Sequence, residues 1–281
     1  MSRFFNYIVI CILPAISMVM FFSFFGIYQV IKNSFGISSG MENITLSYYR
    51  MLFASGEFWQ SFFFSLRVAL IASSLAVTLG AFLAFTVKKA SLKYTQILWD
   101  LFIVMSYVAA AIAVYHTFSD RGFLARILHL TGIYSGSLNL VYSNNGIGVI
   151  LLYVLKGTPF IVISISEIIN KIDTRYRKVS ENLGVPVFPY FIHIVLPLAK
   201  RALFSAWIIL FNFILFSYEG FFFLGVSTPK SLGELSLIFY SSPDFERSTV
   251  SMALSTCMIV GSTALTLVYY KIMKKQTEQG L

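Results

Sequence analysis

Residues 178–197 read KVSENLGVPVFPYFIHIVLP and form a polar, turn-containing segment between two long apolar stretches. Gly184 suits the left-handed residue that ends a helix, and Pro186 and Pro189 block that helix from continuing. The pattern therefore predicts a helix over residues 175–183 that ends in a tight turn. In a membrane protein, such a segment lies outside the hydrocarbon, is buried in protein, or contacts a partner.

The flanks of this turn complete a helix, turn and helix unit. Asp173 and Thr174 supply N-cap chemistry for the first helix. A second short segment, residues 190–194, leads into Leu196-Pro197. The apolar side chains that this unit is expected to expose are Val185, Val187, Phe188 and Phe191.

Composition indicates that the chain folds in a membrane. The sequence is 57% apolar and 12% charged, with a mean hydropathy of +0.78. Its 281 residues leave room for about six spanning helices of roughly 20 residues each. We expect an all-α polytopic protein with a single transmembrane domain over residues 1–281, because no linker or charge run marks a second domain.

The apolar stretches give the expected positions of the spans. They are residues 7–30, 62–87, 96–117, 147–169, 203–224 and 250–270. Residues 32–61 are amphipathic and are expected on the membrane surface. The second span carries small residues at four-residue spacing, which let another helix approach closely; these are Ala72, Ala76, Gly80 and Ala84.

Basic residues predict the topology. With the N-terminus inside, roughly 13 Lys and Arg residues lie on the cytoplasmic side and about 6 on the other, as the positive-inside rule requires. Both termini and residues 171–200 are then cytoplasmic. We interpret the net charge of +9 in this way and expect no nucleic-acid partner.

Motifs for nucleotide or metal chemistry are missing from the sequence. No G-x-x-x-x-G-K-[ST] occurs, so any ATP must be bound by another polypeptide. The three histidines lack the i, i+4 pairing of a metalloprotease, and Cys11 and Cys257 lie in apolar stretches without a spacing partner. We expect no catalysis of a covalent reaction, no metal and no cofactor on this chain.

The spacing after Gly184 resembles a known signature. Nine residues separate Gly184 from Ile194-Val195-Leu196-Pro197. This arrangement resembles the cytoplasmic signature E-A-A, three residues, Gly, nine residues, I-x-L-P of the inner-membrane permeases of binding-protein-dependent ABC importers. The amphipathic ITLSYYRMLF and the six-span layout are similar to the polyamine, iron, sulfate and thiamine branch of this type I architecture. The first half departs from the signature, because Lys178-Val179-Ser180 replace Glu-Ala-Ala; Glu181, on nearly the same helical face, is a candidate substitute.

The resemblance implies a coupling helix over residues 185–191 that docks on a separate ATPase subunit. Its expected coupling residues are Glu181, Gly184, Val185, Val187, Phe188, Phe191, Ile194, Leu196 and Pro197. The alternative is that the apolar residues fold back on the bilayer as an interfacial hairpin. The implied setting is a bacterial inner membrane with its lipids, where the partners are a second permease, two ABC ATPases that bind ATP and Mg, and an extracytoplasmic solute-binding protein. Because Lys178 replaces the signature glutamate, we favour a heterodimer of permeases.

Polar residues within the spans are candidates for the translocation pathway. Lys156 lies nine residues into the fourth span, roughly 14 Å at 1.5 Å per residue and thus close to the midplane. Pro159 cannot donate to the carbonyl of Leu155, so we expect a kink there. The alternative is that Lys156 pairs with Glu219 or another buried acid.

Three further candidates lie elsewhere. Glu219 is expected to line the outer mouth of the cavity and attract a cation. Asn212 is placed near mid-depth. Arg67 is shallower, and we expect its guanidinium to reach the outer headgroups.

These inferences predict a permease subunit that forms half of a translocation pathway for a small polar solute. From the branch resemblance and Glu219, the favoured solute is a cation such as a polyamine. One alternative is an anion such as a phosphonate or sulfate, attracted by Lys156 and Arg67. Another is an ATP-independent carrier or a channel.

Overall fold

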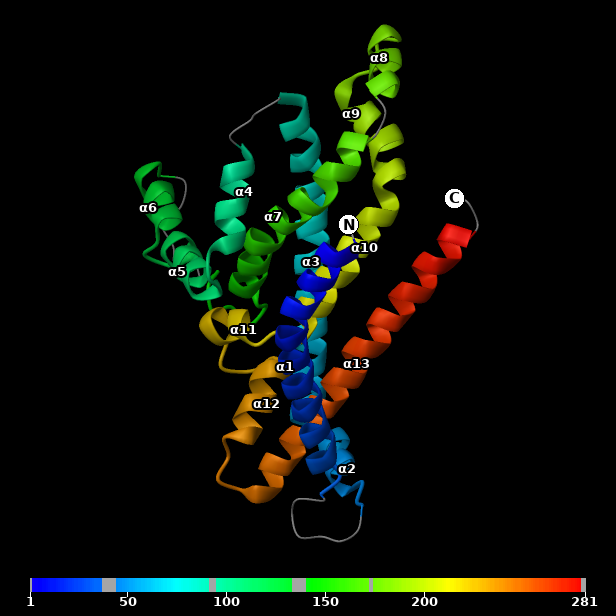
Figure 1. The fold of residues 1–281 in the computed structure, drawn as a ribbon. Helices are drawn as coiled ribbons and strands as arrows, with labels where there is room; N and C mark the ends of the chain where they lie inside the picture. The colour runs from blue at the N-terminus through cyan, green and yellow to red at the C-terminus, as the bar shows by residue number, and fades with distance from the viewer. Residues whose placement is uncertain (1, 37–43, 91–94, 133–139, 172–173, 279–281) are drawn as a thin grey trace. The chain divides into compact units, whose positions relative to one another are not determined.

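The computed structural model describes the chain except residues 1, 37–43, 91–94, 133–139, 172–173 and 279–281 (Figure 1). The described residues are helical and contain no strand, which confirms the all-α prediction. The helices in chain order are α1 Ser2–Ser34, α2 Ser47–Ala54, α3 Gly56–Ala90, α4 Thr95–Val104, α5 Tyr107–Phe118, α6 Phe123–Leu130, α7 Ile147–Lys171, α8 Thr174–Asn182, α9 Val187–Tyr190, the π-helical turn η2 Phe191–Val195, α10 Leu196–Leu215, α11 Glu219–Leu224, α12 Leu232–Tyr240 and α13 Phe245–Glu278.

The helices form two compact units. The smaller unit comprises Met1–Phe58 and Leu235–Gly261. In it, the hydroxyls of Ser34 and Tyr49 share a hydrogen bond of 2.7 Å that joins the end of α1 to α2, the amphipathic helix expected within residues 32–61. The larger unit comprises Trp59–Glu234 and Ser262–Leu281 and holds every candidate site residue.

Five helical segments in the described part of the chain are long and apolar enough to cross a membrane. They are Ile12–Ser34, Gly56–Thr86, Ile147–Ser166, Val187–Leu215 and Phe245–Lys274. The first, second, fourth and sixth expected spans are confirmed as long apolar helices. The third and fifth differ from the expectation.

The third expected span is interrupted, so its prediction as one helix over residues 96–117 is wrong. Helix α4 ends at Val104, and α5 begins at Tyr107. Between them Ser106 adopts an extended backbone, and its hydroxyl accepts a hydrogen bond of 3.2 Å from the Ala109 amide. This N-cap starts a new helix in the middle of an apolar stretch.

The fifth span is shifted toward the N-terminus relative to residues 203–224. A continuous helical path runs over Val187–Leu215, through α9, η2 and α10. Pro197 therefore lies inside a continuous helical path, whereas the sequence predicted that it follows a short segment over residues 190–194. The wide turn η2 contains His193, whose carbonyl the Pro197 ring would otherwise meet, and this accommodates the proline.

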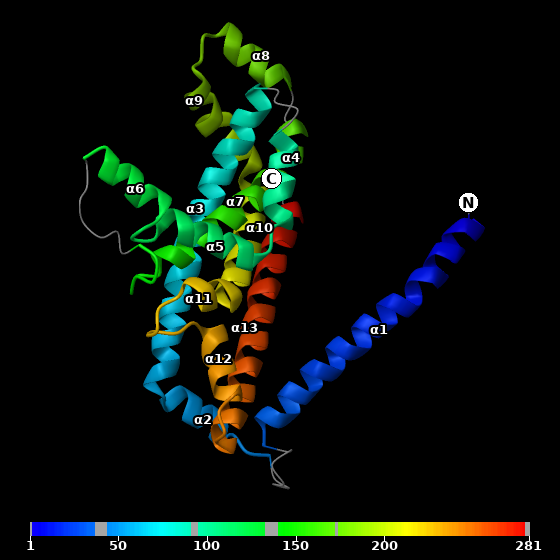
Figure 2. The ribbon, with the colours of Figure 1, turned by 90° about the vertical axis from the view of Figure 1, so that its left-hand side faces the viewer.

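Small residues bring α3 and α7 close together, as the four-residue spacing predicts. Ala72 and Ala76 are fully buried. A methyl group added at Gly80 would lie 2.7 Å from the Ile161 side chain, and one at Gly157 would lie 3.1 Å from the Ala76 methyl. The two backbones are therefore in near contact, which is how helices associate in lipid. Figures 1 and 2 show α3, α7 and α10 running along one another in this unit.

Candidate functional site

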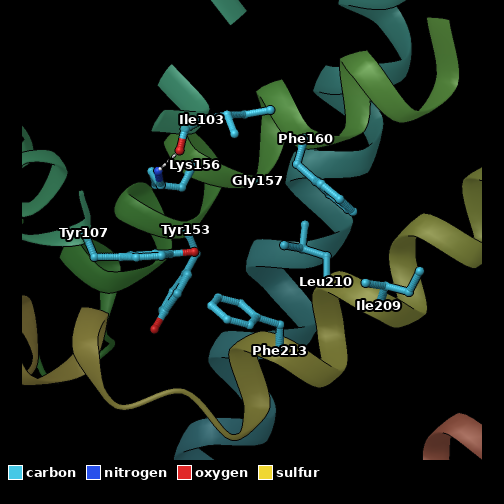
Figure 3. A pocket seen from close by; sticks show the side chains of 9 residues that line it. All are labelled: Ile103, Tyr107, Tyr153, Lys156, Gly157, Phe160, Ile209, Leu210 and Phe213. Atoms are coloured by element: carbon cyan, nitrogen blue, oxygen red, sulfur yellow. Dashed lines mark hydrogen bonds between the residues drawn. The ribbon is translucent and has the colours of Figure 1, made fainter. Parts of the chain in front are cut away.

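A cavity of about 290 Å³ lies among α4, α5, α7 and α10 (Figure 3). Its wall is mainly aromatic and aliphatic, and its one charged group is the ammonium of Lys156. The lining residues are Ile103, Tyr107, Tyr153, Lys156, Gly157, Phe160, Ile209, Leu210 and Phe213. Such an apolar cavity with few polar groups is typical of a small-molecule site.

Lys156 binds the end of the interrupted helix. Its ammonium donates hydrogen bonds to the backbone carbonyls of Phe102 at 3.1 Å, Ile103 at 2.9 Å and Met105. These carbonyls belong to the last turn of α4 and the residue after it, where a helix leaves its acceptors unsatisfied. An ammonium has three N–H donors, so Lys156 keeps none free. Its positive charge also suits the negative end of the helix dipole.

The surroundings of Lys156 differ from the expected ion pair, while the kink at Pro159 stays a prediction. Among the described side chains, no carboxylate forms an ion pair with it, and its partners are backbone carbonyls. Pro159 is buried and does not line the cavity, and α7 continues through it as one helix. The helix interruption beside Lys156 is thus in the neighbouring α4–α5 pair.

Tyr107, which the sequence analysis missed, completes this arrangement. The Lys156 ammonium lies 5.1 Å from the centroid of the Tyr107 ring, within the range of a cation–π interaction. The same ring lies 6.0 Å from that of Tyr153 and 5.9 Å from that of Phe213. Ser106, a hydroxyl within an apolar stretch, is the only signal in the sequence that a helix begins at Tyr107.

Glu219 lies on α11 and is not among the residues that line this cavity, which differs from the expectation that it lines the cavity mouth. It is the first residue of that helix and lies outside the spanning segments, because the fifth span ends at Leu215. Its side chain is exposed and has no hydrogen bond or ion pair within the described part of the chain. The next residue, Gly220, packs closely on the cavity wall, since a methyl group there would lie 2.7 Å from the Tyr153 ring.

The structure does not bring Asn212 and Arg67 to this cavity. The amide nitrogen of Asn212 donates to the Ser262 hydroxyl at 2.9 Å, toward α13, while its buried carbonyl oxygen lacks a partner. Arg67 is exposed and donates to the Asn144 carbonyl at 3.2 Å. It lies at a separate hollow of about 410 Å³, lined by Gln60, Phe63, Phe64, Arg67, Asn144 and Pro229.

The turn at Gly184 forms as predicted. Its φ is +69°, and its amide donates to the Glu181 carbonyl at 3.0 Å. The Val185 amide donates to the Ser180 carbonyl at 2.9 Å. These two bonds define a Schellman motif, which ends α8. Asp173, the other expected cap residue, lies outside the described residues.

Helices α8 and α9 lie at the end of the larger unit opposite α11 (Figures 1 and 2), and exposed apolar side chains follow the turn between them. We call this group the α8–α9 surface, and its exposed members are Leu183, Val185, Val187 and Phe188. Phe188 is 62% exposed, whereas Phe191 is only 8% exposed. The expectation that Phe191 belongs to this surface is therefore wrong. Its ring packs on Phe85 and Phe82 of α3.

The remaining signature residues occupy the helical path and the preceding helix. Ile194 is half-buried, and Leu196 and Pro197 are exposed. Glu181 forms an exposed ion pair of 2.9 Å with Arg177, one helical turn earlier. Lys178, where the signature has glutamate, is exposed beside this pair.

Comparison with known sequences gives one family match over most of the chain. The model of the family described as "Binding-protein-dependent transport system inner membrane component" matches residues 76–278. The spermidine/putrescine transport system permease protein PotB of Escherichia coli (strain K12) is 28% identical over 137 residues, which are 48% of this chain and 49% of that protein. The chain thus spans about half the length of the PotB relatives it matches. PotC of Haemophilus influenzae is 26% identical over 245 residues, 87% of each chain.

Two solved structures share the fold. One is the crystal structure of a bacterial ABC transporter involved in the import of the acidic polysaccharide alginate, with a TM-score of 0.73 and 16% identity over 97% of this chain and 99% of that chain. The other is a bacterial alginate ABC transporter in complex with an alginate pentasaccharide-bound periplasmic protein. Its TM-score is 0.75, again at 16% identity, over 96% of this chain and 95% of that chain. At this identity the two structures show the fold alone.

Proposed function

The chain belongs to the family of binding-protein-dependent transport system inner membrane components, the permeases of type I ABC importers, and from this premise we propose that it forms half of an import pathway for a small cationic solute. The membership confirms the resemblance noted from Gly184 to Pro197. The family consists of transport permeases, and the long apolar helices agree with an inner-membrane protein. Both termini and the α8–α9 surface are proposed to face the cytoplasm, as the distribution of Lys and Arg indicates.

The proposed assembly contains a second permease, two ABC ATPases and an extracytoplasmic solute-binding protein. The family description names dependence on a binding protein, and this dependence argues against an autonomous channel or carrier. One structural neighbour is a transporter in complex with a periplasmic protein. ATP and Mg are proposed to bind the ATPases, with no cofactor on this chain. A heterodimer of permeases remains favoured because of Lys178.

The α8–α9 surface is the proposed docking site for the ATPase. Large apolar side chains lie exposed close together in sequence there, namely those of Leu183, Val187 and Phe188. Such a group on the polar end of a membrane protein marks an interaction site. Closure of the ATPases on ATP would then move this surface and switch the cavity between inward and outward access.

The proposed solute class rests on the state of two charged groups, Lys156 in the cavity wall and Glu219 on α11. All three donors of Lys156 are used by backbone carbonyls, so this residue offers no hydrogen bond to an anion. Glu219, in contrast, has a carboxylate that is free within the described part of the chain, and its neighbour Gly220 lies against the Tyr153 ring. A carboxylate next to aromatic faces suits an ammonium group. The similarity to spermidine/putrescine permeases supports a polyamine-like solute.

An anionic solute is the second candidate, because Arg67 donates to only one described carbonyl and lies at a hollow of its own. A guanidinium carries five N–H donors, which leaves several for a phosphonate or sulfate. In this case Arg67, and not Lys156, would recognise the anion.

Uptake by the assembled transporter tests both candidates. The chain is expressed with the ATPase, second permease and binding protein that co-purify with it, and uptake of labelled spermidine is measured against unlabelled putrescine, sulfate and methylphosphonate. We expect putrescine alone to compete, and Glu219→Gln to raise the half-saturating concentration while Arg67→Gln leaves it unchanged. Transport of labelled sulfate or methylphosphonate that is lost in Arg67→Gln would replace the cationic proposal by the anionic one.

A further inference from the structure

The ammonium of Lys156 contacts both sides of the α4–α5 interruption. It bonds to the carbonyls that α4 leaves free, and it faces the ring of Tyr107, the first residue of α5. One cation on α7 thus fixes the end of one helix and the start of the next.

This contact matters because it supplies hydrogen-bond donors to three backbone carbonyls, those of Phe102, Ile103 and Met105. At this depth in a membrane, backbone acceptors without a partner are costly and must be satisfied inside the protein. Lys156 is 9% exposed and supplies all three bonds. Without it, the chain around Met105 has to find other donors, and the position of Tyr107 two residues later changes with it.

The contact of Lys156 with the α4–α5 interruption affects a solute through Tyr107. Its ring forms part of the cavity wall and packs on Tyr153 and Phe213, from α7 and α10 (Figure 3). Lys156 has no donor left with which to hold a solute itself. We propose that Lys156 is a positioning residue for transport, which holds the Tyr107 ring in the cavity wall by closing the carbonyl end of α4.

The same arrangement indicates how a cation is oriented, and this point rests on the proposed function. Lys156 keeps a positive charge beside the Tyr107 ring, while Glu219 is next to Gly220, which packs on the Tyr153 ring of the same cavity wall. Like charges repel in a medium of low dielectric constant. A solute ammonium is therefore directed away from Lys156 and toward Glu219, with its apolar stem along Tyr107 and Phe213.

A double-mutant cycle on the assembled transporter tests the positioning role. The variants are Lys156→Met, Tyr107→Leu and the double variant, with spermidine uptake as the measurement. Each single variant is expected to raise the half-saturating concentration about tenfold, with a smaller effect on the maximal rate, and the double variant should raise it no further. Effects that multiply to about a hundredfold in the double variant would overturn the proposal, because independent sites behave in that way.

Lys230→Met serves as the matched control. Lys230 also has a bonded ammonium, 3.3 Å from Glu234, but lies away from the cavity wall. Its loss should leave the half-saturating concentration unchanged. If Lys156→Met does not accumulate in the membrane, Lys156→Arg takes its place, since it keeps the charge and the donors in a different geometry. The same lack of additivity with Tyr107→Leu is then expected.

A second measurement does not depend on the identity of the solute. Ile103→Cys is introduced after Cys11 and Cys257 are replaced by alanine, and its labelling rate with a cationic methanethiosulfonate reagent is followed in membranes. Lys156→Met should raise this rate severalfold by releasing the end of α4, while Lys230→Met should not. An unchanged rate in Lys156→Met overturns the positioning role. If the unsubstituted chain does not transport spermidine, the proposal of a polyamine-like solute is wrong. The labelling rate alone then tests the positioning role of Lys156.

Discussion

The ring of Phe191 packs against that of Phe85 on α3, with 4.9 Å between their centroids. Phe188, three residues earlier on the same helical path, is exposed instead. The short segment after Gly184 therefore has one side in the protein core and one side open. Phe191 is therefore part of the core, and Phe188 is available for the proposed contact with the ATPase.

Phe188→Asp is expected to uncouple the permease from its ATPase without unfolding it. The exposed ring makes little contact within the chain, so its loss should leave the thermal unfolding temperature near that of the unsubstituted protein. A charge in the apolar α8–α9 surface should weaken docking. Co-purification of the ATPase and transport-coupled ATP hydrolysis are the measurements.

Phe191→Ala is the control for this prediction. Removing the buried ring should cost about 3–5 kcal/mol of folding stability. The expected pattern is a destabilised Phe191→Ala and a stable but uncoupled Phe188→Asp. Normal ATPase co-purification together with normal uptake in Phe188→Asp would remove the docking role of this surface.

Gly184→Ala should misplace the α8–α9 surface. With φ at +69°, a residue that carries a Cβ is strained by roughly 1–2 kcal/mol. No atom lies within 4 Å of an added Cβ, so the strain is of the backbone alone. Uptake and ATPase co-purification should both fall, and Gly184→Asn should retain more of each because asparagine tolerates this conformation. An equal loss of uptake and co-purification in the two variants would show that the presence of a side chain at this position, and not backbone strain, is the cause.

The Gly184 turn could be predicted from sequence because its cause is local. A glycine, two following prolines and the helix before them determine the backbone without help from distant residues. The close approach of another helix to α3 could also be predicted, since Ala72, Ala76 and Gly80 recur at helical spacing, but the identity of that helix as α7 could not.

The interruption between α4 and α5 could not be predicted in this way, because the residue that satisfies it lies elsewhere. Residues 96–117 have the composition of an uninterrupted span, and the donors for the free carbonyls come from Lys156, about fifty positions later. Likewise, Phe188 and Phe191 look equivalent in the sequence. The π-helical turn at η2 and the packing on Phe85 decide which of them is buried.

Gly80→Ala is expected to separate α3 from α7. The added methyl group would lie 2.7 Å from the Ile161 side chain and 3.1 Å from the Thr158 carbonyl oxygen. Overpacking of this kind costs about 1–3 kcal/mol. The thermal unfolding temperature in detergent should fall. Gly56→Ala, where no atom lies within 4 Å of the added group, should show no such loss, and a Gly80→Ala protein as stable as this control would contradict the close packing.

Glu181→Gln tests whether this carboxylate replaces the glutamate that the signature has at the position of Lys178. Its ion pair with Arg177 is exposed, and such pairs contribute only about 0.3–0.5 kcal/mol, so the folding stability should hardly change. A fall in ATPase co-purification and uptake is expected, because the carboxylate lies one turn from the α8–α9 surface. Arg177→Gln removes the same ion pair but keeps the carboxylate, and should retain coupling. If Arg177→Gln and Glu181→Gln behave alike, the ion pair matters and the carboxylate has no separate role toward the ATPase.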